Sequence, residues 1–274
     1  MSMARQVTAS ELQVVDLTKR YNGVAVVDDV SFTVATGEFV AILGPSGAGK
    51  TTLFRCIAAL TQLDSGRVVV HRRELHRLRG AQLCAARREI GLIFQQFNLI
   101  RRLTALENVL AGRLGHVPTW RALVRHFGAA DRQLALASLD RVGLLDYAAQ
   151  RADRLSGGQQ QRVAIARVLA QQSRFILADE PVASLDPETA ASVLDILRAV
   201  SRERGIAVLC SLHQVELATT FADRIIGLRD GRVVLDLPAA QLSASDCSVI
   251  YRADPEAQQP SRPSEATQPC RILS

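Results

Sequence analysis

The feature that most constrains the fold is a glycine-rich loop placed between an apolar strand and a helix. Residues 39–43 are all apolar, which is typical of a strand buried on both faces of a sheet. They lead directly into the run Gly44-Pro-Ser-Gly-Ala-Gly-Lys-Thr51, which satisfies the pattern G-x-x-x-x-G-K-[ST]. A helix is expected from Lys50 to about residue 60. Strand, loop and helix in this order predict an α/β domain whose loop wraps a phosphate group.

The residue types in this loop suit a nucleotide bound together with Mg²⁺. Glycines let several backbone N–H groups face the phosphates, and the N-terminus of the following helix adds its partial positive charge. Lys50 is expected to reach the β- and γ-phosphates, and the Thr51 hydroxyl to ligate Mg²⁺. The expected nucleotide-binding residues of the loop are Gly44, Pro45, Ser46, Gly47, Ala48, Gly49, Lys50, Thr51 and Thr52.

A second apolar run ends in two carboxylates. Residues 175–178 are apolar and are followed by Asp179, Glu180 and Pro181, and the proline stops the strand. Ligands of open α/β sheets bind at the carboxyl ends of the strands, so both acids are expected beside the nucleotide. Asp179 fits the Mg²⁺ shell, and Glu180 fits a general base that activates the attacking water.

Composition excludes several classes of protein. The chain has 274 residues, 48% of them hydrophobic, and no stretch of about 18 apolar residues that could span a membrane. No signal-like apolar segment opens the chain, so we expect it in the cytoplasm, with its five cysteines as free thiols. The net charge is +6, but the paired arginines lack interleaved aromatic residues and no nucleic-acid motif accompanies them, so nucleic acid is not an expected partner.

The order of predicted elements indicates an α/β fold with three parts. Residues 11–18 and 30–34 alternate like half-buried strands and indicate an N-terminal antiparallel part. Helix-forming sequence without strands occupies about 96–160 and predicts a helical subdomain inserted in a mainly parallel sheet. A capping-box pattern at Thr104 and Glu107 marks one helix start in it, and Asp230-Gly231 predicts a hairpin. We expect residues 246–274 to be a flexible tail.

The string Leu155-Ser-Gly-Gly-Gln159 adds a second anion-binding helix start to a chain that already has one. With the phosphate loop and the acidic strand end, it makes residues 11–245 resemble the ATP-binding-cassette (ABC) ATPases, which have a P-loop NTPase core. The resemblance implies ATP hydrolysis, with ATP and Mg²⁺ bound between two copies in a head-to-tail dimer. It also implies that Ser156, Gly157, Gly158 and Gln159 cap the γ-phosphate held by the partner chain.

Single residues elsewhere match the same family by their order around the three motifs. The resemblance implies that Gln95 touches Mg²⁺ and the attacking water, and that His213 contacts the γ-phosphate. It also implies that Tyr21 stacks on adenine and that residues 184–186 cross the dimer interface. The expected catalytic residues are therefore Glu180, His213, Lys50 and Gln95, and the expected metal ligands are Thr51, Gln95 and Asp179.

Several stretches are similar to the ATP-binding subunits of bacterial phosphonate importers, among them residues 94–99, 102–110 and 222–231, and residues 112–115 with Trp120 soon after. This resemblance implies a peripheral protein on the cytoplasmic face of the inner membrane. Its partners would be a second copy, two permease subunits and, indirectly, a periplasmic phosphonate-binding protein.

Other readings stay open at the level of sequence. The cargo could instead be phosphate, phosphite, methionine or polar amino acids, because the motor would be the same. An accessory ABC protein of carbon–phosphorus bond cleavage would need no permease. Translation-factor and DNA-repair ATPases are disfavoured by the single cassette and the lack of heptads. A sensor without hydrolysis is disfavoured by Glu180 and His213.

Overall fold

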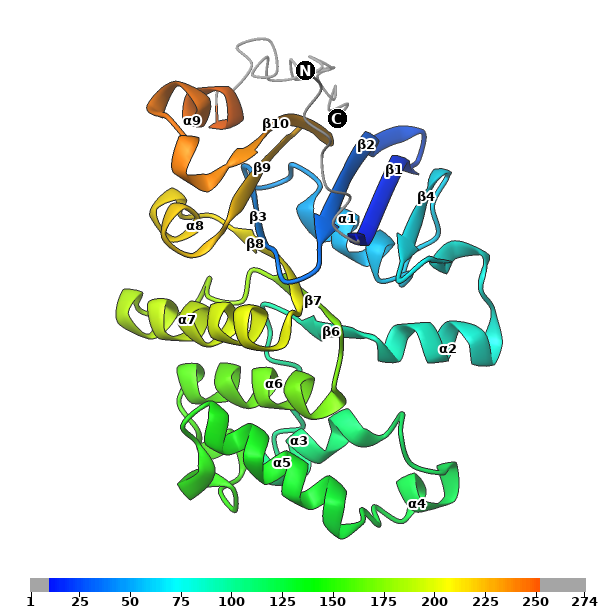
Figure 1. The fold of residues 1–274 in the computed structure, drawn as a ribbon, viewed down its shortest axis with the longest axis vertical. Coiled ribbons are helices and arrows are strands. Elements are labelled where there is room, and N and C mark those ends of the chain that lie inside the picture. The colour runs from blue at the N-terminus through cyan, green and yellow to red at the C-terminus, as the bar shows by residue number, and fades with distance from the viewer. Residues whose placement is uncertain (1–9, 252–274) are drawn as a thin grey trace, which may run out of the picture.

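The computed structural model describes residues 10–251, and its centre is a six-stranded sheet (Figure 1). The strand order is β10-β9-β3-β8-β7-β6, and the five strands from β9 to β6 run parallel. The last strand, β10, is antiparallel to β9, and the predicted Asp230-Gly231 turn joins the two. The strands are β3 (Phe39–Leu43), β6 (Ile90–Ile93), β7 (Phe175–Asp179), β8 (Ala207–Leu212), β9 (Arg224–Arg229) and β10 (Arg232–Pro238).

A second, antiparallel sheet forms the N-terminal part, as predicted. Its order is β2-β1-β4-β5, with strands β1 (Ser10–Tyr21), β2 (Val24–Ala35), β4 (Ser65–Val70) and β5 (Arg73–Glu74). The first two strands are longer than the alternation of residues 11–18 and 30–34 indicates. The pairing register shifts between Val14 and Leu17, which interrupts the period-2 pattern there. The strands meet at Asn22-Gly23, where both φ angles are positive (50° and 83°), as a two-residue hairpin turn requires.

Helices cover both faces of the six-stranded sheet. On the side of the antiparallel sheet lie α1 (Lys50–Ile57), η1 (Leu75–Arg77) and α2 (Gly80–Arg88). Between β6 and β7 the chain forms α3 (Ala105–Leu110), η2 (Ala111–Arg113), α4 (Thr119–Leu123), α5 (Ala129–Arg141), η3 (Leu145–Tyr147), η4 (Ala152–Arg154) and α6 (Gly157–Gln171). After β7 follow α7 (Pro187–Arg204), α8 (Val215–Phe221), η5 (Ala239–Gln241) and α9 (Ala244–Tyr251).

The stretch predicted to be helical carries the predicted cap. Thr104 Oγ1 accepts the Glu107 N–H and the Glu107 side chain accepts the Thr104 N–H, so both halves of the capping box are formed. Among the described residues of this stretch, the only extended pairing is an isolated bridge between Thr104 and Arg151. In Figure 1, α3, α4 and α5 lie at the end of the molecule opposite β9 and β10.

The core has two clusters, one on each face of the six-stranded sheet. Val40 and Ile42 of β3 point into the cluster shared with α1 and the antiparallel sheet, whereas Phe39, Ala41 and Leu43 point into the cluster shared with α6 and α7. Every side chain of β3 is therefore buried. This explains why the strand is an unbroken apolar run.

The boundary of the predicted tail needs a correction. Residues 246–251 belong to α9, and Ile250 of this helix is fully buried against β9. A backbone carbonyl of the helix, that of Val249, accepts a hydrogen bond from Arg229 Nη1 at 2.7 Å. One apolar anchor within a polar stretch is a weak sequence signal, so composition alone places the end of the fold too early. The rest of the predicted tail, residues 252–274, lies outside the described residues.

Candidate functional site

The loop after β3 curls around a cavity of about 250 Å³. The cavity is lined by the loop from Ser46 to Thr52, by Val26 and by Glu180. Glycine is required at two places in this loop. A Cβ on Gly44 would lie 2.3 Å from the Leu228 carbonyl oxygen, and one on Gly49, where φ is 97°, would lie 2.4 Å from the Val26 carbonyl oxygen. The helix α1 starts at Lys50, so its free N–H groups face the same space.

Lys50 is folded back into the loop that carries it. Its ammonium donates to the Gly44 carbonyl at 2.8 Å and to the Pro45 carbonyl at 3.0 Å, and the residue is 5% exposed. Burial lowers the pKa of this amine, while the nearby carboxylates of Glu180 and Asp179 raise it. A poorly solvated cation surrounded by carbonyl dipoles is a strong binding partner for a phosphate group.

Asp179 is the inner of the two acids at the end of β7. Its Oδ1 accepts a hydrogen bond from Ser211 Oγ at 2.8 Å, and the residue is 9% exposed. Burial raises the pKa of this carboxyl, and hydrogen bonds from Ser211 and Thr51 lower it. The hydroxyl of Thr51 therefore lies next to the carboxylate, and two oxygen donors side by side are the chemistry that Mg²⁺ prefers.

Glu180 is held in an unusual backbone conformation. Its φ is 49°, in the left-handed region that non-glycine residues rarely adopt. The Glu180 N–H donates to Ser211 Oγ at 2.8 Å, and its Oε1 contacts His213 Nε2. Since Glu180 also lines the cavity, the carboxylate and the histidine are brought together at the phosphate loop.

The sequence did not predict Ser211. It is fully buried. Its hydroxyl donates a hydrogen bond to the Asp179 carboxylate and accepts one from the Glu180 N–H. Its sequence signal is a hydroxyl within the otherwise apolar strand β8, next to the loop that carries His213. Strand periodicity cannot indicate which neighbouring strand such a residue faces.

The predicted signature at the start of α6 does not line this cavity. Ser156 Oγ accepts the Gln159 N–H at 3.3 Å, and Gln159 Oε1 accepts the Ser156 N–H at 2.9 Å. Ser156 and Gly157 are exposed, whereas a Cβ on Gly158 would lie 2.3 Å from Thr189 Cγ2. The cap occupies the Gln159 N–H and leaves the N–H groups of Gly157 and Gly158 without a partner inside the helix.

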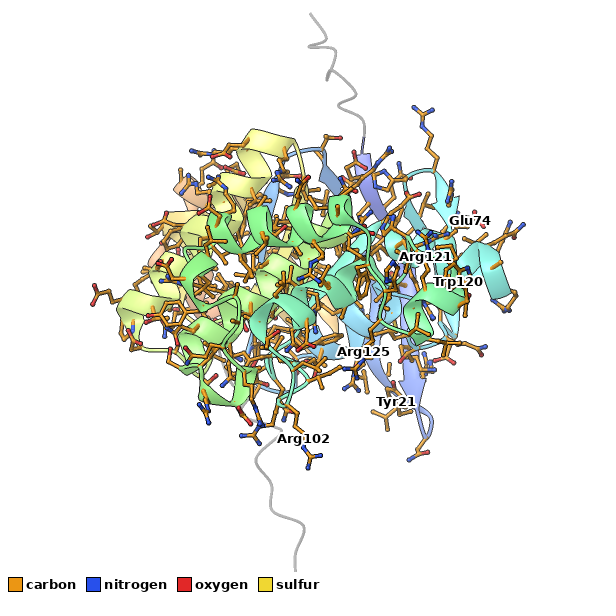
Figure 2. All side chains as sticks on the ribbon, turned by 90° about the horizontal axis from the view of Figure 1, so that it is seen from below. Tyr21, Glu74, Arg102, Trp120, Arg121 and Arg125 are labelled. Carbon is orange, nitrogen blue, oxygen red and sulfur yellow. The ribbon has the colours of Figure 1, made fainter. Side chains whose placement is uncertain are left out.

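Two further predicted residues, Tyr21 and Gln95, do not line this cavity. Tyr21, labelled in Figure 2, ends β1 and is 45% exposed. Lys19 Nζ lies 5.2 Å from the centroid of its ring. Gln95 is exposed after β6, and within the described part of the chain its side chain makes no hydrogen bond. The structure thus groups Lys50, Thr51, Asp179, Glu180 and His213, and leaves the side chains of Gln95 and Tyr21 exposed.

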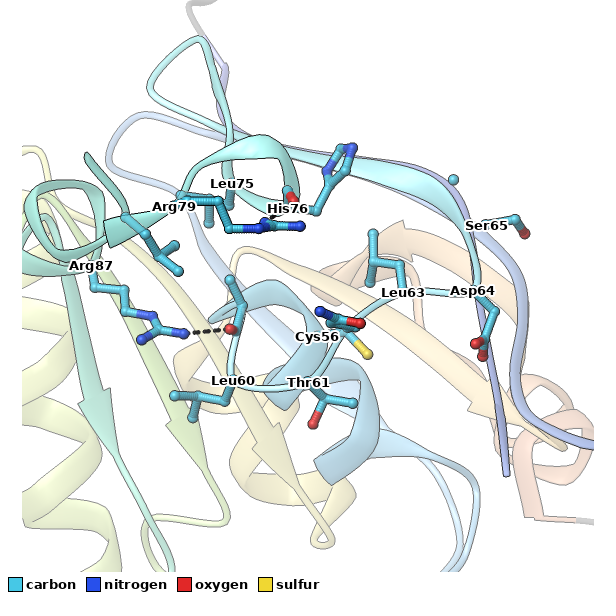
Figure 3. Close-up of a pocket in the computed structure, with 14 residues that line it drawn as sticks. Cys56, Leu60, Thr61, Leu63, Asp64, Ser65, Leu75, His76, Arg79 and Arg87 are labelled. Carbon is cyan, nitrogen blue, oxygen red and sulfur yellow. Dashed lines mark hydrogen bonds between the residues drawn. The ribbon is translucent and has the colours of Figure 1, made fainter. Parts of the chain in front are cut away.

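A larger cavity of about 530 Å³ lies elsewhere, between the end of α1, β4 and α2 (Figure 3). Leu60, Leu63 and Leu75 form apolar walls, and Arg87 Nη2 donates to the Ala59 carbonyl at 2.5 Å. None of the loop, acidic or signature residues lines it. The smaller cavity is therefore the candidate nucleotide site.

Comparison with known proteins gives concordant results. The pattern of the ABC transporter family matches residues 27–183. The chain is 51% identical to a hypophosphite import ATP-binding protein of Stutzerimonas stutzeri, over 88% of this chain and 71% of that one. It is 50% identical to a phosphonates import ATP-binding protein of Frankia casuarinae, over 87% and 95% of the two chains. A phosphate-import ATP-binding protein of Mycolicibacterium smegmatis is 50% identical over 90% and 94%.

Solved structures agree with these relatives. A dimeric ATP-binding cassette in a post-hydrolysis state, bound to ADP and Pi, superposes with a TM-score of 0.72. It is 35% identical to this chain and covers 84% of it and 100% of its own length. Within residues 10–251, no helix has both the length and the apolar character needed to cross a bilayer.

Proposed function

We propose a cargo and a mechanism for this chain, which belongs to the ABC transporter family and is an ATP-hydrolysing subunit of that family. The proposed cargo is a phosphonate, imported across the inner membrane. The observation that carries this proposal is the 50% identity to a phosphonates import ATP-binding protein, which extends over 87% of the chain. The cargo would not touch the described site, because the residues grouped there would be occupied by the nucleotide and Mg²⁺.

The proposed mechanism starts from the phosphate loop. The N–H groups at the start of α1 and the Lys50 ammonium would bind the β- and γ-phosphates, replacing the two carbonyl contacts that Lys50 now makes. The oxygens of Thr51 and Asp179, which lie side by side, would hold a Mg²⁺ ion, and the Gln95 amide oxygen would be a third ligand. When bound, this ion would neutralise charge on the phosphate oxygens.

Glu180 and His213 would act on the attacking water. The Glu180 carboxylate would accept the water proton as the oxygen attacks the γ-phosphorus and the bond to ADP breaks. His213 touches the same carboxylate and would hold it in place beside the γ-phosphate. The products are ADP and inorganic phosphate, and the proton leaves from Glu180.

We further propose that two copies share two ATP molecules. The start of α6 is exposed, and its N–H groups could bind an anion, but it does not line the cavity of its own chain. A head-to-tail partner would bring these groups to the γ-phosphate. Dimeric cassettes at 35% identity support this arrangement. In this proposal residues 96–160 form a helical subdomain that moves when the dimer closes. The dimer would lie against two permease subunits at the cytoplasmic face of the membrane.

The test of the cargo is uptake in a strain from which the gene has been deleted. Labelled 2-aminoethylphosphonate, phosphate, phosphite and hypophosphite are supplied in parallel, and the strain carries the wild-type chain or Glu180→Gln. We expect phosphonate uptake only with the wild-type chain. If phosphonate uptake persists in the deletion strain with no second system present, the phosphonate proposal is wrong.

Hypophosphite is the second candidate cargo, because the relative of that description is 51% identical. Both cargoes are small phosphorus oxyanions, and the ATP site has no features that separate them. Loss of hypophosphite uptake alone in the deletion strain would identify this alternative. ATP hydrolysis by the purified chain is measured separately, so that a wrong cargo is not mistaken for an inactive motor.

A further inference from the structure

The short helix α4 carries a group of large apolar side chains that no other part of the described chain covers. Trp120 is 61% exposed, Leu123 is 80% exposed and Val124 is 66% exposed. The helix has only five residues, Thr119–Leu123, and none of them is buried. We call residues 114–125 the α4 loop. ATP hydrolysis gives these exposed side chains no role.

The base of the α4 loop is firmly attached to the body of the protein. Arg113 Nε donates to Asp131 at 2.8 Å, and Arg113 Nη1 donates to the Ala170 carbonyl at 3.0 Å. His116 Nε2 lies 3.0 Å from the Gln171 carbonyl oxygen, and the Gly115 carbonyl accepts from Arg88. The fold thus fixes both sides of the base and presents the apolar tip outward.

The surroundings of the tip are basic. Arg121 lies over the Trp120 ring, 5.1 Å from its centroid, and Arg125 follows one turn later in the chain. Figure 2 also labels Glu74 in the direction of Arg121, but this acid pairs with Arg77 at 2.6 Å. Across residues 10–251, none of Arg101, Arg102, Arg121 and Arg125 lies within ion-pair distance of a carboxylate. The single acid between residues 98 and 130 is Glu107, which is engaged in the cap of α3.

We propose that the α4 loop rests on a bilayer surface of anionic phospholipid. Trp120, Leu123 and Val124 enter the boundary between headgroups and acyl chains, and the arginines pair with headgroup phosphates. Tryptophan and arginine are suited to this boundary, because each has an apolar body and a polar or charged end. A convex tip with no buried residue suits a deformable lipid surface better than a close-fitting protein groove, and free arginines match the negative potential of a cytoplasmic leaflet.

This proposal does not depend on the cargo. It deepens the peripheral location proposed above, and it assigns direct lipid contact to the ATPase subunit itself. If the chain were attached through the permease alone, only protein contacts would hold it at the membrane. Contact by the α4 loop adds an attachment that is weak, reversible and sensitive to salt, as expected for a few apolar side chains and a few arginines.

Trp120 is the only tryptophan in the 274 residues, so its fluorescence reports on this loop directly. The full chain is mixed with protein-free vesicles of phosphatidylcholine, with or without phosphatidylglycerol. We expect a blue shift and quenching by bromine-labelled lipid only when phosphatidylglycerol is present, and loss of both at high salt. An unchanged spectrum with anionic vesicles would overturn the proposal.

Variants distinguish a specific contact of the α4 loop from non-specific binding to vesicles. Leu123→Ser and the double variant Arg121→Gln with Arg125→Gln keep the tryptophan and should each weaken vesicle binding by about tenfold. Leu145→Ser is the matched control, because Leu145 is also exposed (44%) but lies outside the α4 loop. Equal binding by all variants would contradict the proposal. The proposal would also be contradicted if residue 120 crosslinked to a permease while the purified chain did not bind lipid vesicles. Unchanged ATP hydrolysis shows that each variant is folded.

Discussion

Ser211 Oγ donates to Asp179 Oδ1 at 2.8 Å and joins the ends of β8 and β7. The two residues are register partners in the parallel pairing of these strands, so the contact follows from the sheet. The same oxygen accepts the Glu180 N–H at 2.8 Å. One buried hydroxyl therefore stabilises the ionised form of the inner acid and fixes the backbone of the outer one.

Replacement of Ser211 by alanine should impair both stability and turnover. The Glu180 N–H loses its acceptor, and an unsatisfied group of this kind costs about 1–3 kcal/mol of unfolding free energy. Without the hydroxyl, burial raises the pKa of Asp179 further, so the acidic limb of the rate profile should move to higher pH. Denaturant unfolding and pH-dependent ATPase assays measure the two effects.

Ser201 provides the control for this experiment. It is also buried, and its Oγ donates to the Gly37 carbonyl at 3.1 Å, far along the sheet from the acids. Ser201→Ala should lower stability but leave the pH profile in place. A Ser211→Ala enzyme with the wild-type pH profile would show that Ser211 has a structural role only.

Replacement of Asp179 by asparagine should make the nucleotide-free protein more stable at neutral pH. Because burial raises the folded pKa of Asp179, ionising it opposes folding. The loss of unfolding free energy begins as pH rises past the pKa of an unfolded aspartate and is complete above the raised pKa of the folded state. Below both pKa values it is absent. The melting temperature of Asp179→Asn should therefore exceed that of the wild-type protein at pH 7 and match it in acid.

The same variant should bind Mg²⁺ more weakly. Removal of a group that merely orients a metal ligand costs about 10–100-fold in affinity, so loss of a proposed ligand should cost at least as much. Magnesium titration of ATP hydrolysis gives this value. A variant that is less stable at neutral pH, or that needs no extra magnesium, would contradict the assigned position of Asp179.

Replacement of Glu180 by glutamine should leave ATP bound but nearly unhydrolysed. The amide cannot accept the water proton, and loss of a general base costs about 10²–10⁴ in rate. Binding of a fluorescent ATP analogue and release of phosphate are compared with the wild-type chain. Hydrolysis within about twofold of wild type would remove Glu180 from this role.

Tyr251 in the last turn of α9 should help to position the histidine loop. Its hydroxyl donates to the His213 carbonyl at 3.3 Å and also meets the Gly44 N–H. Burial raises its pKa, so the hydroxyl keeps its proton. Tyr251→Phe should lower kcat by about 2–10-fold, the value of one hydrogen bond, with little change in the KM for ATP. Tyr147→Phe, at a similarly exposed tyrosine outside the site, should leave kcat unchanged.

Local chemistry explains which parts of the structure could be predicted. The phosphate loop and the Thr104 capping box depend on residues close together in the chain, so short motifs were enough. The helices α2, α8 and α9 were not predicted, because each has nine residues or fewer, and the 3.6-residue period hardly repeats over such a length. The Asn22-Gly23 turn has a sequence typical of a two-residue hairpin and adopts the positive φ angles that such a turn requires.

The sequence by itself determined the strand, loop and helix around Lys50, because glycine freedom and helix N–H groups act within a few residues. It also determined the acidic end of β7 and the type of chemistry that these residues suit. Only the tertiary structure decided that Ser211 meets Asp179, that Tyr251 reaches His213 and that Trp120 stays uncovered. The reason is that sheet order, strand register and the packing of distant helices are set by burial of the whole core, which no local pattern encodes.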